Sequence, residues 1–437
     1  MKKLALVLAL LALVCLVSCG GKKDSASTTT TAAAQASTTT TATTSTTGTG
    51  EKITLTVWGS QEDQALLKTM CNAYAAAHPE KTYKFLYGVQ SESDAADKVL
   101  NDPESGPDVF AFASDQINKL IQAGALARVG GTILDDIRNV NTVGSIDAAT
   151  VTIGGEDRVY AYPMTGDNTF FLYYDSSKLS AEDVKSLDRM LEVAAGLGKQ
   201  VAFKLYDDGW YLSSFFFADP NLAYKVTYSD DLTESKVEIN YDSAAGLDVM
   251  KALRTYFANG ALSANVDDSK ILAGIQSGTI IAAVTGTWNR NQIKDVWGDK
   301  MAVAVLPTAT IGGKQIQLNG FFGYKLIGVN GYSQNKSEAH KLAQWLTNEE
   351  NQKLRFQERG LGPTNKAVVS SAEVQKDAVI SVVLKQAEYF RTQKGVPGSY
   401  WTPMASLTKQ FADVDPMTVT DADLQALLDS LCAQVRR

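Results

Sequence analysis

The chain has 437 residues, a formal net charge of −7, two histidines and four cysteines. Its negative charge argues against nucleic acid as a partner. About 390 residues follow the N-terminal segments, which is more than one hydrophobic core usually serves, so we expect two lobes.

The first nineteen residues have the pattern of a secretory signal. Lys2 and Lys3 precede an apolar run from Leu4 to Val17, and Cys19 follows it. The run is shorter than the roughly 20 residues that span a membrane, and a cysteine at this boundary is a site for lipid. We therefore predict a lipoprotein signal peptide over 1–19, with Cys19 lipidated and the protein held outside the cell membrane, at the cell surface or in the periplasm. An ordinary signal peptide or an uncleaved anchor is the alternative.

Residues 20–50 consist mostly of Thr, Ala and Ser. They lack the apolar side chains that would offset the entropy of ordering, so we predict a disordered tether. A flexible chain of this length has a root-mean-square reach of roughly 30 Å, enough to hold a folded domain off a membrane.

Strand-like and helix-like patterns alternate in the rest of the chain. We expect strands at 53–58, 82–87, 109–112, 169–174, 201–205, 280–284, 301–306 and 321–329. Between them we expect helices at 61–78, 94–100, 117–123, 180–195 (opened by a capping box of Ser180 and Asp183), 210–217 and 242–260. Helices then dominate, at 337–347, 349–359, 371–393, 404–412 and 421–435. This alternation predicts α/β lobes, each a sheet flanked by helices.

We find no complete catalytic or metal-binding motif in the sequence. His78 and His340 each lie beside predicted helix surface, which favours solvated residues over ligands. No zinc-binding, phosphate-binding or nucleophile motif is complete, so we expect no cofactor, no metal and no enzyme. Cys71 and Cys432 both lie on apolar helix faces, and we predict two buried free thiols, with a disulfide as the alternative.

Aromatic residues cluster at the ends of predicted strands and in nearby turns. They are Trp58, Phe112 (followed by Asp115), Trp210, Tyr211, Trp288 and Trp401. Ligands of open α/β sheets bind beyond the carboxyl ends of the strands. Aromatic faces beside carboxylates and amides suit a polyhydroxylated ligand such as a sugar. Each aromatic residue could equally be part of the core.

Several sequence blocks together resemble the extracellular solute-binding proteins of ABC importers, in the maltose-binding protein branch. They include GPDVFAFASD over 106–115, VYAYP over 159–163 and TGTW over 285–288. Further blocks lie in the same order at 53–59, 120–126, 171–175, 304–307, 321–329, 333–346 and 360–363. Each block is weak alone, but their order and spacing over residues 52 to 412 are specific.

The resemblance implies a two-lobed periplasmic-binding-protein fold of type II, with a ligand cleft between the lobes. The N-lobe would comprise residues 51–163 plus 306–362, and the C-lobe residues 167–304 plus 366–437. The hinges would lie at 163–167, 305–307 and 361–365, where the chain crosses between lobes.

The same resemblance implies roles for single residues. Phe112 and Asp115 would line the N-lobe side, and Asp167 would take the place of an acidic ligand contact. Trp288 would stack on the ligand from the C-lobe. The remaining candidates, placed less firmly, are Trp58, Trp210, Tyr211 and Trp401. Gln116 stands where a charged residue is familiar, and the crossover that contains Asp167 is one residue longer, so the identity of the sugar stays open.

We therefore expect a monomeric, membrane-anchored receptor that is not an enzyme. It would capture a carbohydrate, in particular an oligosaccharide, by hinge closure and deliver it to the permease subunits of an ABC importer. The alternatives are a receptor for a non-sugar solute and an extracellular glycan-active enzyme, which would need a placed acid–base pair.

Overall fold

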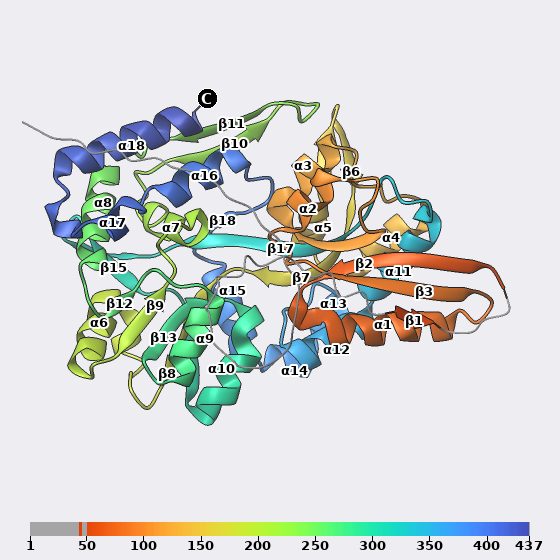
Figure 1. Cartoon of the computed structure of the whole chain (residues 1–437), viewed down its shortest axis with the longest axis horizontal. Helices are drawn as coiled ribbons and strands as arrows, with labels where there is room; N and C mark the ends of the chain where they lie inside the picture. The colour runs from red at the N-terminus through yellow and green to blue at the C-terminus, as the bar shows by residue number, and fades with distance from the viewer. Residues whose placement is uncertain (1–42, 46–49, 437) are drawn as a thin grey trace, which may run out of the picture. The chain divides into compact units, whose positions relative to one another are not determined.

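The computed structural model describes residues 43–45 and 50–436 (Figure 1). The predicted signal peptide, the lipidation site Cys19 and most of the predicted tether lie outside the described residues. Thr43–Ser45, within the predicted tether, form a short strand, β1, that pairs antiparallel with β3, and the disorder of the tether stays a prediction. Among the described residues, no helix is both long and apolar enough to cross a membrane.

The first lobe is built on a seven-stranded sheet with the order β1-β3-β2-β4-β17-β18, and β7 also pairs with β17. Its strands after β1 are β2 (Lys52–Gly59), β3 (Thr82–Val89), β4 (Val109–Ala113), β7 (Ala161–Asn168), β17 (Gly320–Val329) and β18 (Phe390–Thr392). In β2 the side chains of Ile53, Leu55 and Val57 are buried in alternation with threonines, as the period of two predicts.

Helices of the first lobe include α1 (Gln64–Ala77), α2 (Ala95–Asn101), α3 (Ile117–Gln122), α4 (Gly131–Val140), α5 (Val143–Ala149), α11 (Lys336–Leu346) and α12 (Glu349–Arg359). A hairpin of β5 (Thr150–Ile153) and β6 (Glu156–Val159) precedes β7. Strands and helices share one hydrophobic cluster that runs from Ile53 to Leu346 in sequence.

The second lobe is built on a five-stranded sheet with the order β12-β9-β13-β8-β14. These strands are β8 (Phe171–Asp175), β9 (Gln200–Phe203), β12 (Leu262–Ser263), β13 (Ile280–Thr285) and β14 (Met301–Ala304). All six residues of β13 are buried, which explains its uninterrupted apolar sequence, because hydrophobic clusters cover both faces of this sheet.

Helices of the second lobe include α6 (Leu187–Gly196), α7 (Gly209–Phe216), α8 (Ala244–Phe257), α9 (Asp268–Gln276), α10 (Arg290–Trp297), α15 (Ala378–Gln386), α16 (Gly398–Ser406) and α18 (Asp421–Val435). Its hairpins are β10 (Tyr224–Tyr228) with β11 (Ser235–Ile239), and β15 (Thr308–Ile311) with β16 (Lys314–Gln317). The short helices are α13 (Lys366–Val369), α14 (Ala372–Gln375) and α17 (Gln410–Asp413).

The hydrophobic cluster to which each residue belongs indicates where the chain passes from the second lobe back to the first. Leu306, Ala309, Ile311 and Leu318 pack in the cluster of the second lobe. Leu326, further along β17, packs in the cluster of the first lobe. The sequence places this crossing at 305–307, whereas the packing favours a crossing within β17, which lies beside β7 in Figure 1. The other lobe boundaries remain predictions.

Several predicted helices differ from those in the structure. Ser180 and Asp183 do bond to each other's backbone, but Ser186 caps α6, which begins at Leu187. The expected helix over 371–393 divides into α14, α15 and β18, because Asp377 caps α15 and residues 390–392 pair with β17. The expected helix over 404–412 is α16 followed by α17, so Trp401 lies in a helix rather than in a turn.

Both described cysteines are free and buried, which confirms the predicted thiols. Cys71 packs in the cluster of the first lobe and Cys432 in that of the second. His340 is only partly exposed and bonds to the hydroxyl of Tyr162 at 2.8 Å, so the expectation of a freely solvated residue is wrong for it.

Candidate functional site

Four aromatic rings of the second lobe form a group that we call the aromatic cluster: Phe170, Trp210, Tyr211 and Trp288. The ring of Phe170 lies 4.7 Å from that of Trp210 and 4.6 Å from that of Tyr211, centre to centre. Trp210 lies 5.9 Å from Trp288, with 37° between their planes. Phe170 and Tyr211 are buried, whereas both tryptophans are partly exposed and can offer a face to a ligand.

Local backbone geometry fixes both tryptophans. The carboxylate of Asp208 caps α7 by accepting hydrogen bonds from the N–H groups of Trp210 (2.9 Å) and Tyr211 (3.1 Å). Trp288 lies in a 3₁₀ turn, Thr287–Asn289, directly after Gly286. A Cβ added at Gly286 would lie 1.9 to 2.4 Å from three atoms of the Trp288 ring, so the indole lies against the backbone there and only glycine allows it.

Asp115 stands at the carboxyl end of β4, in the 3₁₀ turn Ser114–Gln116. Its Oδ1 accepts a hydrogen bond from Gln393 Nε2 at 3.0 Å, and Gln393 Oε1 accepts one from Asn168 Nδ2 at 3.0 Å. Burial raises the pKa of this carboxyl to about 6, although Gln393 favours its charged form.

Trp401 reaches the same surroundings from α16. Its ring lies 4.9 Å from that of Phe321, and its indole is close enough to Asp115 to favour the charged carboxylate. The Nε1–H group still forms no hydrogen bond of standard geometry, and the same is true of the buried Nε1–H of Trp210. Two buried indole donors are therefore left without a hydrogen-bond partner of standard geometry in the protein.

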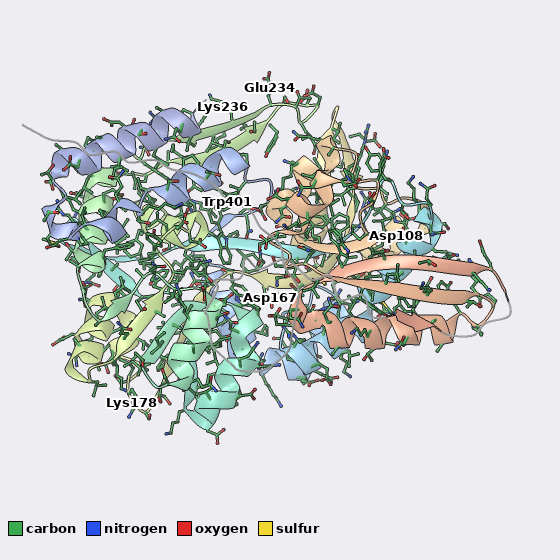
Figure 2. The ribbon with its side chains drawn as sticks, viewed as in Figure 1. Asp108, Asp167, Lys178, Glu234, Lys236 and Trp401 are labelled. Atoms are coloured by element: carbon green, nitrogen blue, oxygen red, sulfur yellow. The ribbon has the colours of Figure 1, made fainter. Side chains whose placement is uncertain are left out.

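The predicted ligand contact Asp167 occupies a different environment. Its side chain is 1% exposed, and its Oδ2 accepts hydrogen bonds from Thr287 Oγ1 (2.7 Å) and from the N–H group of Gly362 (2.7 Å). Its Oδ1 is buried without a hydrogen-bond partner. Figure 2 labels Asp167, at the end of β7, and Trp401. The carboxylate thus binds to protein groups from two distant segments.

The sequence does not predict a largely buried ion pair between Lys325 and Glu92 close to the aromatic cluster. Lys325 Nζ lies 3.1 Å from Glu92 Oε2, and the two side chains are 11% and 8% exposed. The same ammonium lies 5.7 Å from the centre of the Trp288 ring. Burial lowers the pKa of Lys325, but Glu92 and other nearby carboxylates outweigh it, so the net shift is upward. A lysine within the otherwise apolar segment 321–329 is the signal that could have found this pair.

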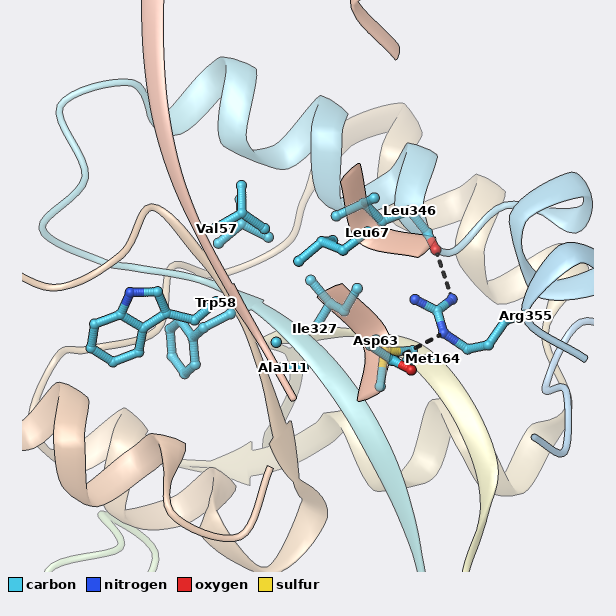
Figure 3. Close-up of a pocket in the computed structure, with 12 residues that line it drawn as sticks. Val57, Trp58, Asp63, Leu67, Ala111, Met164, Ile327, Leu346 and Arg355 are labelled. Carbon is cyan, nitrogen blue, oxygen red and sulfur yellow. Dashed lines mark hydrogen bonds and ion pairs between the residues drawn. The ribbon is translucent and has the colours of Figure 1, made fainter. Parts of the chain in front are cut away.

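Two other candidates lie in the first lobe. The ring of Phe112 is fully buried in the core, 5.6 Å from that of Phe110, so it supports the end of β4 from within. Trp58 is partly exposed and lines a cavity of about 10 Å³, roughly the room for one water, together with Asp63 and Arg355 (Figure 3). Within the described part of the chain, no three His, Cys, Asp or Glu side chains are arranged to hold a metal ion.

Comparisons with known proteins agree with this architecture. The model of the family described as bacterial extracellular solute-binding protein matches residues 69–381. A galactooligosaccharide-binding protein of Bacillus subtilis is 22% identical over 380 residues, which cover 84% of this chain and 87% of that protein. A maltooligosaccharide ABC transporter solute-binding lipoprotein of Streptococcus pneumoniae is 24% identical over 375 residues, 83% of this chain and 84% of its own.

A solved structure with acarbose is similar in both sequence and fold. It is 33% identical, has a TM-score of 0.76, and covers 88% of this chain and 99% of its own. The family match spans well over half of the 437 residues. The chain therefore belongs to the family of bacterial extracellular solute-binding proteins and has the two-lobed α/β fold of their maltose-binding branch.

Proposed function

We propose that this protein is the substrate-binding component of an ABC importer and captures an oligosaccharide between its two lobes. The observation that carries the proposal is the pair of partly exposed indoles, Trp210 and Trp288, in a chain related to oligosaccharide-binding proteins. Sugar rings have apolar faces that pack on aromatic surfaces, and their hydroxyls need hydrogen-bond partners.

Hydrogen-bonding groups for the sugar hydroxyls lie close to Trp401. Its Nε1–H and that of Trp210 can donate to hydroxyl oxygens, and the Asp115 carboxylate can accept from hydroxyl groups. Hydrogen bonds to a charged group are the stronger kind, so Asp115 would fix the orientation of a sugar that the indoles bind less selectively. We assign ligand contact to Trp210, Trp288, Trp401 and Asp115.

Capture proceeds by closure of the lobes, a motion for which periplasmic binding proteins are a standard example. A ligand drives closure only through a difference in affinity between the open and closed states. The aromatic cluster belongs to the second lobe and Asp115 to the first, so a ligand that touches both favours the closed state.

The protein acts as a receptor rather than an enzyme, and Cys19 carries the lipid that anchors it outside the cell membrane. Support comes from the relatives, which are named as binding proteins, one of them as a lipoprotein. The closed, loaded form would dock on the permease subunits of the importer.

The proposed function is tested by calorimetry and thermal shift with maltotriose, longer maltodextrins and a galactooligosaccharide, with a dipeptide and a polyamine as non-sugar controls. We expect a saturable rise in melting temperature with at least one oligosaccharide, because a ligand of the native state stabilises it. Chromatography of the same mixtures should detect no product. A response to the controls alone would favour a non-sugar receptor, and product in excess of protein would favour a glycan-active enzyme.

The anchor is tested separately by Cys19→Ala in the full chain. Stable anchoring needs at least two acyl chains, so loss of the lipidated cysteine should release the protein from membranes or leave it unprocessed. Unchanged detergent partitioning and unchanged migration would contradict lipidation at Cys19.

A further inference from the structure

Asp167 joins three segments that are far apart in sequence. It lies near the end of β7, and its Oδ2 accepts hydrogen bonds from Thr287, 120 residues away, and Gly362, 195 residues away. The N–H group of Gly166 also donates to the carbonyl oxygen of Gly362 at 2.9 Å. Both the β7 segment and the Gly362 segment coincide with predicted crossings between the lobes, so the carboxylate ties two crossings to one turn of the second lobe.

The turn that Thr287 belongs to is the one that presents Trp288. Thr287 is 2% exposed and immediately precedes the indole, which lies against Gly286. On its other side, Asn289 donates to Thr285 Oγ1 (3.0 Å) and to Asp268 (2.7 Å). The turn is thus held by the second lobe through Asn289 and by the crossing segments through Asp167, and Trp288 lies between these two attachments.

A further bond reinforces the link to the same crossing. Arg290, two residues after Trp288, donates to the carbonyl oxygen of Gly360 at 3.2 Å and pairs with Asp377. Gly360 closes α12 of the first lobe in the left-handed conformation, with φ of 66°. A shift of the segment that contains Gly360 and Gly362 would therefore reach the Trp288 turn through both Asp167 and Arg290.

The groups around the Asp167 carboxylate would allow it to exchange one hydrogen-bond partner for another. Lys325 and Arg355 both lie close enough to interact with its charge. Its Oδ1 and the hydroxyl of Tyr173, which senses the Asp167 charge, are both buried without hydrogen-bond partners. Unpaired buried polar atoms are rare in native structures and call for an explanation, such as a second arrangement that satisfies them.

We propose that Asp167 is a positioning residue, which couples the Trp288 turn to the crossings between the lobes rather than contacting the ligand. This role rests on the proposed function only where it concerns ligand binding, since the hydrogen bonds that link the Trp288 turn to the crossings are made between protein groups alone. Movement of the crossing segments then changes the orientation of the Trp288 indole. In return, a ligand stacked on Trp288 shifts the conformational equilibrium of the crossing segments.

The ligand-free test uses ¹⁹F NMR of the full chain labelled with 5-fluorotryptophan, with the Trp288 signal assigned by its loss in Trp288→Phe. Thr287→Val removes the hydroxyl that bonds to Asp167 and keeps the side-chain shape, and Thr287→Ser is its matched control. Asp167→Leu removes the acceptor of the same hydrogen bond. We expect Thr287→Val and Asp167→Leu to shift or broaden the Trp288 signal, and Thr287→Ser to restore it. An unchanged Trp288 signal in both variants would overturn the coupling, whatever the ligand proves to be.

A second measurement addresses the lobes. Spin labels at exposed Lys98 in α2 and Gln276 in α9, introduced as cysteines, report the distance between the lobes. Native Cys71 and Cys432 are buried and do not compete for label, and Cys15 and Cys19 are replaced by serine in the labelled chain. We expect Thr287→Val to broaden the distance distribution without ligand, with Thr287→Ser matching the parent. Identical distributions in all three proteins would show that the bond carries no coupling.

Where an oligosaccharide binds the parent, Thr287→Val should weaken binding about tenfold, the effect of losing one hydrogen bond to a charged group, with Thr287→Ser near the parent. A double-mutant cycle with Asp167→Asn should be non-additive, because the two side chains act as a pair. Additive losses would contradict the coupling. If no oligosaccharide binds the parent, the proposed function fails, while the NMR and distance measurements still decide the role of Asp167. If Thr287→Val melts too low for study, the comparison of Asp167→Asn with Asp167→Leu replaces it, since Asn keeps an acceptor oxygen.

Discussion

The two lobes bring different chemistry to the candidate site. On the first-lobe side the polar groups already have partners in the protein: Glu92 pairs with Lys325, and Asp115 accepts from Gln393. On the second-lobe side the indole donors of Trp210 and Trp401 have no such partner. The first lobe thus holds charge that is paired within the protein, whereas the second lobe holds apolar ring faces and indole N–H groups without a partner of standard geometry.

The largest effect should come from breaking the balanced charge of the first lobe. Lys325→Met leaves the Glu92 carboxylate buried without its cation, which lowers the free energy of unfolding by about 3–5 kcal/mol. Denaturant titration measures the loss. The double variant Lys325→Met, Glu92→Met should recover most of it, because the uncompensated charge is gone. A stable single variant would show that the pair is not a structural element of the first lobe.

On the second lobe, Trp288→Ala should affect binding more than stability. The lost stacking face is worth on the order of 1–3 kcal/mol by analogy with base stacking, or about tenfold to a hundredfold in oligosaccharide affinity measured by calorimetry. Trp345→Phe is a control, since Trp345 packs on the first lobe and donates to the carbonyl oxygen of Met70. Unchanged affinity with a normal melting curve in Trp288→Ala would remove the indole from the site.

The smallest expected effect is the change in stability and affinity with pH that comes from protonation of Asp115. Its folded-state pKa of about 6 lies above the usual value of about 3.9, so the folded protein binds this proton more tightly than the unfolded chain. The contribution of this group to stability is therefore greatest below pH 4 and is lost as the pH rises through about 6. A carboxylate that accepts from ligand hydroxyls is neutralised in the same window, so affinity should fall several-fold from pH 7 to pH 5.

Asp115→Asn supplies the control for both pH effects. Calorimetry of this variant should show weaker binding at neutral pH and little remaining dependence on pH between 5 and 7. A parent-like pH dependence in the variant would mean that another group is responsible.

The sequence predicts the architecture better than the site, for physical reasons. Alternation in 53–58 and the buried run 280–284 follow from burial patterns that leave a direct mark on the sequence, and both strands are present. The helix predicted over 371–393 fails at its end because residues 390–392 pair with β17, a tertiary contact that no local pattern records.

The same limit applies to single residues of the site. Phe112 lies at a strand end as predicted, yet the sequence does not reveal that its ring faces the core. Asp167 meets Thr287 and Gly362 only through the fold, and Glu92 meets Lys325 across 233 residues. Residue type and spacing therefore indicate aromatic and acidic candidates, while the partners that decide their roles come from the three-dimensional arrangement.

We propose that the indoles of the second lobe and the Asp115 carboxylate of the first bind one oligosaccharide together. Calorimetry of a double-mutant cycle between Trp288→Ala and Asp115→Asn, with the oligosaccharide that raises the melting temperature most, tests it directly. A ligand that bridges the lobes should give losses that are not additive, because neither lobe alone holds it. Additive losses, or binding unaffected by either change, would contradict the claim.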